Sequence, residues 1–247
     1  MECDLKKIAA EEIIQSRSAW LSQNGINLSS IPNITRIMKF DYDFQFIPLT
    51  YKLADLSWSE ILIMSSNAGL GKTTSLLSIV QKFDAAKITA SSSLIENDDK
   101  DNGSDIRATE TFPSRVEDVI KSVYDLSLFD FVFYIPMRNN NFDNFNDYIK
   151  SLLPQTLGND ENDEVLDRVI EAIYLSKCLI LCDGFNEANA KAQKLFEQLI
   201  GFDFSRYTFI ISTRPDNIEK LTSIISNASR RARFVMIVSG LPLQDQI

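Results

Sequence analysis

One segment of the chain joins a hydrophobic run, a loop of small residues and an amphipathic run without interruption. The hydrophobic run, residues 61–64, contains β-branched side chains and is long enough for a short buried strand. The loop is rich in Ser, Gly and Ala and ends in Gly-Lys-Thr at residues 71–73. Apolar residues at helical spacing follow, from Leu76 to Phe83. A strand, a loop and a helix in this order favour folds in which the carboxyl edge of a sheet meets a helix N-terminus.

The same segment has the context that a phosphate-binding loop requires. Gly69 and Gly71 let backbone N–H groups turn toward phosphate oxygens, and the helix N-terminus adds positive potential. The Lys72 ammonium can reach the β- and γ-phosphates of a nucleotide, and the Thr73 hydroxyl can ligate Mg²⁺. The pattern G-x-x-x-x-G-K-[ST] is incomplete, because its first glycine is Ser66 here. The predicted nucleotide-binding residues are Ser66, Asn67, Ala68, Gly69, Leu70, Gly71, Lys72, Thr73 and Thr74.

A second hydrophobic run ends in a carboxylate. Residues 179–182 are apolar, and Asp183 follows them directly. Ligands bind at the carboxyl ends of the strands in open α/β sheets, so we expect Asp183 to hold Mg²⁺ there through water. Glu187, four residues further on, is the candidate for polarising an attacking water. The alternative is that Asp183 caps a turn and Glu187 begins a helix.

A third hydrophobic run, residues 209–212, ends in Thr213, Arg214 and Pro215. Thr213 and Arg214 are predicted to lie at the same sheet edge as the first two motifs. A cation at that edge can sense a γ-phosphate and neutralise charge during its transfer. The predicted catalytic residues are therefore Glu187, Asp183 and Arg214, with Thr73 and Asp183 as metal ligands. The alternative for Arg214 is a surface side chain beside a turn.

Strands and helices alternate over most of the chain. The predicted strands are 60–65, 129–135, 178–182, 207–212 and 234–238. The predicted helices are 1–22, 72–83, 116–126, 142–153, 164–175, 188–200 and 216–226. This alternation predicts an α/β fold, namely a P-loop NTPase with a mostly parallel five-stranded sheet in a three-layer αβα sandwich. The predicted parts are a short N-terminal helical and irregular extension (1–57), the NTPase domain (58–240) and the start of a truncated C-terminal part (241–247).

Two regions outside these elements are mainly polar. Residues 44–49 could form a short strand, which Pro48 would confine to a sheet edge. The stretch 84–115 is predicted to be a mobile surface insertion, because its acidic centre at 96–105 has too few apolar residues to pack. An acidic run of this kind can also bind Mg²⁺ or a partner.

Composition excludes several classes of function. A net charge of −9 argues against nucleic-acid binding, which depends on Lys and Arg neutralising phosphates, and the cluster 230–233 is a small exception. The absence of histidine excludes Ser-His-Asp and Cys-His nucleophiles and histidine-ligated metals. The three cysteines cannot form a disulfide framework; Cys178 and Cys182 are expected to share one face of a buried strand. Without a signal peptide or a spanning apolar run, the chain is expected to be cytoplasmic and to have no membrane partner.

Taken together, these motifs resemble the NACHT domain of the STAND class of signalling NTPases, the nucleotide-binding module of NOD-like receptors. The first motif, NAGLGKTT at 67–74, is similar to the P-loop of that family. The second, LILCDGFNE at 179–187, is similar to its hydrophobic–Asp-Gly-hydrophobic-Asp-Glu motif. The third, FIISTRP at 209–215, resembles its sensor strand, and FVFYI at 131–135 with Arg138 falls in family order. The resemblance covers residues 58–240.

The resemblance implies an ATP-dependent signalling switch with slow ATP hydrolysis, for which innate immunity is the family's commonest setting. The ADP-bound form would be closed and resting, and the ATP-bound form would open and associate with itself or with protein partners. By this resemblance, Lys72 and Thr73 contact phosphates and Mg²⁺, Asp183 serves Mg²⁺, Glu187 assists hydrolysis and Arg214 senses the γ-phosphate.

The chain departs from the family at three points. Ser66 replaces a glycine, and Asn186 replaces the usual aspartate, which bears on hydrolysis more than on binding. The chain also stops soon after Gly240, where family members continue, so a fragment of a larger receptor is one expectation. Two alternatives stay open: a non-hydrolysing nucleotide-binding scaffold, and a small P-loop kinase. The base could also be guanine, although no Asn-Lys-x-Asp motif that reads guanine appears.

Overall fold

The computed structural model of the chain describes residues 2–28, 61–69, 71–93, 126, 129–154, 163–201, 206–228 and 234–237. Several predictions made above concern residues outside these ranges. They are the possible strand at 44–49, the acidic segment 96–105, nearly all of the helix at 116–126, the arginine cluster at 230–233, and Leu70.

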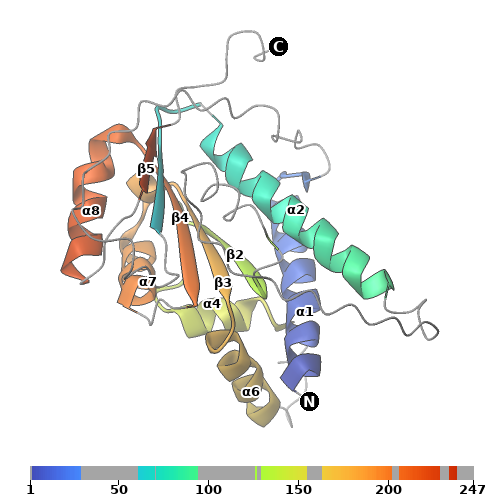
Figure 1. Cartoon of the computed structure of the whole chain (residues 1–247). Coiled ribbons are helices and arrows are strands. Elements are labelled where there is room, and N and C mark those ends of the chain that lie inside the picture. Colours follow the sequence, from blue (N-terminus) through green and yellow to red (C-terminus); the bar gives the residue numbers. More distant parts are fainter. Residues whose placement is uncertain are drawn as a thin grey trace, which may run out of the picture.

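A parallel sheet lies at the centre of the molecule (Figure 1). Its strands are β1 (Ile61–Ser65), β2 (Phe131–Pro136), β3 (Cys178–Asp183), β4 (Tyr207–Thr213) and β5 (Phe234–Ile237), side by side in the order β2-β3-β4-β1-β5. Every described pair of neighbours runs parallel. The predicted α/β class and the parallel sheet are confirmed. The order also places β4 between β1 and β3, which carry the first and second motifs.

Helices cover both faces of this sheet (Figure 1). They are α1 (Glu2–Gln23), α2 (Lys72–Ser93), α4 (Phe145–Ser151), α6 (Asp163–Tyr174), α7 (Ala190–Gly201) and α8 (Ile218–Asn227). Successive side chains of a strand point to opposite faces, and the buried residues accordingly fall into two clusters. One cluster joins the sheet to α2, and the other joins it to α4, α6, α7 and α8, while α1 contributes to both.

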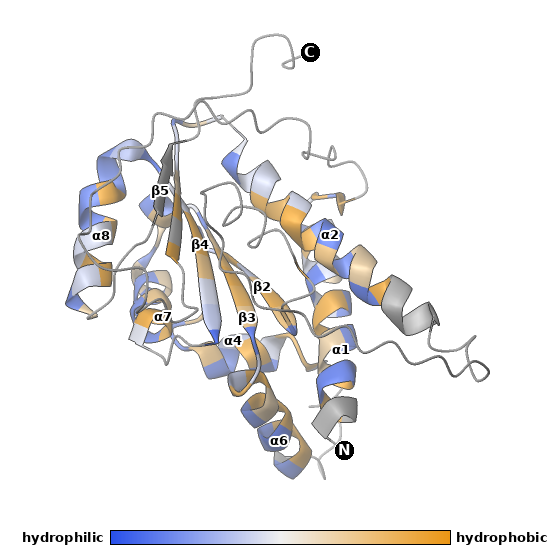
Figure 2. Ribbon diagram, in the orientation of Figure 1, coloured by the Kyte–Doolittle hydropathy of each residue, from blue (hydrophilic) through white to orange (hydrophobic). Residues whose placement is uncertain are grey.

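The strands are apolar because both of their faces are covered. The first five residues of β3 and all seven of β4 are buried, and Figure 2 shows β2 and β3 as mainly hydrophobic. Cys178 and Cys182 lie in the same cluster as free thiols, as the sequence predicted. Burial raises the pKa of both thiols, which therefore stay protonated as core residues.

Two predicted helices have different limits in the structure. Helix α2 continues to Ser93, so assigning residues 84–93 to a mobile insertion was wrong. Those ten residues include three alanines, which favour a helix, and Asp84 is buried in an ion pair. Helix α4 covers Phe145–Ser151 rather than 142–153, because the Asn144 side chain accepts from the backbone N–H of Asp147 and caps the helix there.

The N-terminal helix α1 is attached to the sheet through a buried polar contact. Arg17 donates hydrogen bonds to the backbone oxygen of Val132 on the edge strand β2 and to the Asp84 carboxylate on α2. Arg17 and Asp84 are only 4% and 6% exposed. One side chain thus joins α1, α2 and β2, the outermost strand of the sheet in the described part of the chain. Within the part of the chain that the structure describes, no helix is both long and apolar enough to cross a bilayer.

Candidate functional site

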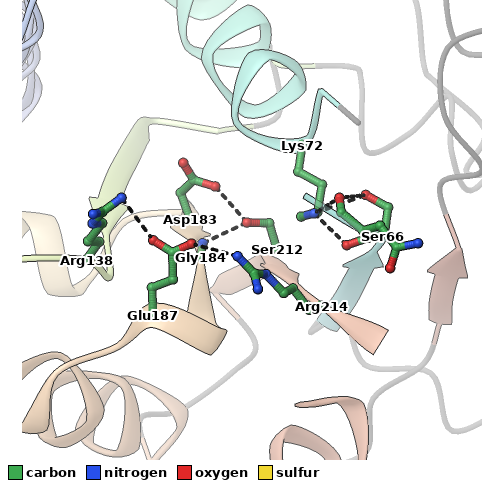
Figure 3. A network of polar contacts seen from close by, with 9 residues as sticks. Ser66, Lys72, Arg138, Asp183, Gly184, Glu187, Ser212 and Arg214 are labelled. Atoms are coloured by element: carbon green, nitrogen blue, oxygen red, sulfur yellow. Dashed lines mark hydrogen bonds and ion pairs between the residues drawn. The ribbon is translucent and has the colours of Figure 1, made fainter. Parts of the chain in front are cut away.

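The three motifs meet at the carboxyl edge of the sheet, as the sequence predicted. Ser65 at the end of β1 is paired with Thr213 at the end of β4, and the backbone N–H of Ser66 donates to the Thr213 oxygen at 3.3 Å. Cys182 of β3 is paired with Ile211 of β4, which sets Asp183 beside Ser212. Figure 3 shows that the side chains from β3 and β4 face the start of α2.

The loop at residues 66–71 requires its two glycines for their backbone conformation. Gly69 has a φ of 79° and Gly71 a φ of 80°, values that L side chains rarely adopt. Among the described residues, and leaving aside each glycine's chain neighbours, no atom lies within 4 Å of a Cβ placed at either position, so the space there is open. Helix α2 starts directly after the loop, and Ser75 donates to the Gly71 oxygen from both its N–H and its hydroxyl. The first N–H groups of α2 lack partners within the helix and can bind an anion.

Lys72 is held over the beginning of its own loop. Its Nζ donates to the Ser66 backbone oxygen at 2.6 Å, to Ser66 Oγ at 3.1 Å and to the Asn67 oxygen at 2.8 Å (Figure 3). The serine in place of the first glycine therefore gives the lysine an additional acceptor. Burial lowers the pKa of Lys72, and Arg214 also lowers it, whereas Asp183 and Glu187 act in the opposite direction. The charged groups of all three motifs are thus close enough to affect one another.

Both oxygens of the Asp183 carboxylate accept hydrogen bonds from hydroxyl groups. Ser212 donates to Oδ1 at 2.7 Å, and Tyr134 on β2 donates to Oδ2 at 2.9 Å. Ser212 Oγ in turn accepts from the backbone N–H of Gly184 at 2.7 Å. Burial, together with the charge of Asp183, raises the pKa of Tyr134, which therefore stays a protonated donor. Sequence reasoning missed Tyr134, which it treated only as part of a hydrophobic strand.

Glu187 lies between two arginines. Gly184, with a φ of 78°, turns the chain after β3 into a short 3-10 helix, η5 (Phe185–Glu187). The Glu187 carboxylate then lies 3.6 Å from Arg138 and 3.6 Å from Arg214, which follow the ends of β2 and β4. Figure 3 shows Glu187 between them. The sequence placed Arg138 in the correct loop without assigning it this contact.

The predicted nucleotide-binding residues differ in their exposure to solvent. The exposed ones are Asn67, Ala68, Gly69 and Thr73, the partly buried ones are Gly71, Lys72 and Thr74, and the buried one is Ser66. Thr213 is fully buried, and within the described chain neither its hydroxyl nor that of Ser65 has a hydrogen-bond partner. Asn186 is partly buried in η5, one residue before Glu187.

The donors and acceptors at this edge fit a magnesium-bound nucleotide. The ammonium of Lys72, the start of α2 and the open glycine faces suit phosphate oxygens, and Asp183 and Thr73 offer the oxygen ligands that Mg²⁺ prefers. No group of three or more Cys, Asp or Glu gathers as metal ligands in the described parts of the chain, so Mg²⁺ would need phosphate oxygens and water as further ligands.

Comparisons with known proteins identify no family for this chain, so the proposed function rests on the geometry of the site. The chain matches no protein-family model, and no curated protein matches it significantly.

Proposed function

We propose that this chain is an ATP-binding signalling NTPase module, a nucleotide-dependent switch of conformation and association that hydrolyses ATP slowly. The observation that carries the proposal is the meeting of Lys72, Asp183, Glu187 and Arg214 at one edge of a parallel sheet. These residues come from three separate motifs. If the charged residues had only a structural role, there would be no reason for all three motifs to place charged groups at the same edge of the sheet. In this proposal the finer fold is that of a P-loop NTPase with a five-stranded sheet.

Each residue then has a defined task toward the nucleotide. The 66–71 loop and the start of α2 bind the phosphates, and the Lys72 ammonium exchanges its contacts with Ser66 and Asn67 for phosphate oxygens. Asp183 and Thr73 hold Mg²⁺, which when bound neutralises charge on the β- and γ-phosphates. Arg214 lies within reach of Lys72 and Glu187 and acts as the cation that detects the γ-phosphate.

Glu187 is the group that orients and polarises the attacking water. In the structure its carboxylate is shared between Arg138 and Arg214 at 3.6 Å each. A γ-phosphate that attracts Arg214 weakens one of these pairs and so frees Glu187 for the water. Hydrolysis is then linked to the presence of the γ-phosphate, which is the behaviour that a slow switch requires.

The resemblance to NACHT domains supports the signalling role within this proposal. A cytoplasmic protein of this type alternates between a resting ADP form and an ATP form that associates with copies of itself or with protein partners. A non-hydrolysing nucleotide-binding scaffold is the second candidate. The observation that favours it is Asn186 beside Glu187, because an amide there removes one acidic group from the metal side of the site.

The test is nucleotide binding by the whole chain. Nucleotide released from the purified, denatured protein is identified, and ATP, ADP and GTP are then titrated with Mg²⁺. We expect adenine nucleotides to bind tightly, and Lys72→Ala to weaken binding about 100-fold, because the charge-assisted bonds to phosphate are lost. Lys87→Ala is the matched control, since this lysine is on the same helix with its ammonium over the Phe83 ring.

Two outcomes would contradict the proposal. A folded wild-type chain that binds none of the three nucleotides would show that this edge of the sheet is not a nucleotide site. Equal weakening by Lys72→Ala and Lys87→Ala would show that the effect comes from lost charge on α2 rather than from the loop. Binding with no turnover would instead favour the scaffold.

A further inference from the structure

Tyr134 connects the edge strand β2 to the carboxylate proposed to serve Mg²⁺. Its side chain is 4% exposed, and its hydroxyl donates to Asp183 Oδ2 at 2.9 Å. β2 is the neighbour of β3, and Pro136 of β2 is paired with Asp183, so the tyrosine lies two residues before the position opposite the carboxylate. Because alternate residues share a face, Tyr134 and Asp183 lie on the α2 side of the sheet.

The tyrosine is itself held from two sides. The Tyr148 hydroxyl of α4 donates to the Tyr134 backbone oxygen at 2.7 Å, in a buried contact. The Trp20 ring of α1 lies 6.3 Å from the Tyr134 ring in a tilted arrangement. Two helices therefore contact Tyr134, α4 at its backbone oxygen and α1 at its ring, while its hydroxyl donates to Asp183.

We propose that Tyr134 is a positioning residue that holds the Asp183 carboxylate in the orientation in which it receives Mg²⁺. This inference rests on the proposed nucleotide-binding function. Ser212 fixes Oδ1 and Tyr134 fixes Oδ2, so rotation of the carboxylate about its bond to Cβ breaks at least one short hydrogen bond. Each carboxylate oxygen keeps a further lone pair for a metal-bound water.

The proposal has a physical precedent in the way metal sites are tuned. Partners that hydrogen-bond a ligating carboxylate fix its direction, and their removal lowers metal affinity about 10- to 100-fold. Tyr134 is a partner of this kind, because its hydroxyl donates to Oδ2 of the Asp183 carboxylate. It also extends the influence of α1 to the site, because Trp20 packs on its ring.

The experiment measures the Mg²⁺ concentration that half-saturates ATP binding. Tyr134→Phe removes only the hydroxyl and keeps the ring against Trp20. Tyr207→Phe is the matched control, because Tyr207 is 3% exposed and its hydroxyl donates to the Tyr174 backbone oxygen of α6 at 3.1 Å. Tyr207 begins β4, so it lies at the end of that strand away from the site. ATP affinity in EDTA and the melting temperature are measured for both variants, and Asp183→Asn shows the effect of losing the charge on the carboxylate.

We expect Tyr134→Phe to raise the half-saturating Mg²⁺ concentration about tenfold and to leave ATP affinity in EDTA within about twofold of wild type. If the tyrosine had only a structural role, both tyrosine variants would have a lower melting temperature, and the Mg²⁺ requirement would not change separately from the ATP affinity in EDTA. An unchanged Mg²⁺ requirement in Tyr134→Phe, with wild-type ATP binding intact, would overturn the inference and leave the proposed function standing. A wild-type chain that binds no ATP in either condition would overturn the proposed function, and the inference with it.

Discussion

Glu187→Gln is expected to lower ATP hydrolysis at least 100-fold and to leave ATP binding within about threefold of wild type. The amide has the size of the carboxylate but cannot polarise a water. Its loss of charge also removes the contacts of Glu187 with Arg138 and Arg214, which are 3.6 Å long and exposed to solvent. Exposed pairs of this kind contribute about 0–1 kcal/mol, so we expect little change in the melting temperature.

The measurement is single-turnover hydrolysis together with ATP affinity. Glu219→Gln is the control, because Glu219 is exposed in the first turn of α8. This substitution removes the same charge at a position away from the site. Equal hydrolysis by Glu187→Gln and wild type would show that Glu187 is not the catalytic group. A loss of binding as large as the loss of turnover would assign Glu187 to nucleotide binding instead.

Arg17→Ala is expected to destabilise the protein by about 3–5 kcal/mol, the usual cost of leaving one partner of a buried ion pair alone. Arg17 contacts the Asp84 carboxylate and the Val132 oxygen, and both arginine and aspartate are almost fully buried. The control is Arg168→Ala, which breaks the exposed pair between Arg168 and Glu164 on α6. We expect that change to cost less than about 1 kcal/mol in chemical denaturation. Equal losses in the two variants would refute the role of Arg17 as the link between α1 and the sheet.

The same ion pair makes stability depend on pH in a specific direction. Burial raises the pKa of Asp84 to about 6, although Arg17 acts in the opposite sense. A carboxyl whose pKa is higher in the folded than in the unfolded state stabilises the fold fully below its unfolded pKa, at about pH 4. This stabilisation is lost as the pH rises through the folded pKa of about 6. We therefore expect wild type to gain on the order of 2 kcal/mol over Asp84→Asn when the pH falls from 6.5 to 4.5. A constant difference between the two proteins across this range would contradict the raised pKa.

Much of the site could be read from the sequence because its residues lie at strand ends. Asp183 and Arg214 follow long apolar runs, and parallel strands bring their carboxyl ends to one edge. The order β2-β3-β4-β1-β5 was not predictable, since hydrophobic patterns say where strands are and not which of them pair.

The parts that the sequence missed depend on contacts between distant residues. Tyr134 reads as one more apolar residue of a strand, and only the position of Asp183 across the pair β2–β3 makes its hydroxyl part of the site. The continuation of α2 beyond residue 83 was missed because Asp84 looks like the start of a polar loop. Its burial depends on Arg17 of α1, far away in the chain.

The strand order has a consequence for how the protein is made. β1 lies between β4 and β5, so Ile61 pairs with Phe209 and Leu62 with Phe234, which leave the ribosome much later. Pairings over such long separations form slowly, and both edges of β1 stay open until the last strands are synthesised. During synthesis, therefore, the 66–71 loop exists long before it has the neighbouring strands that complete the site. A growing chain that ends before β4 should need a chaperone and should gain no protection from added nucleotide.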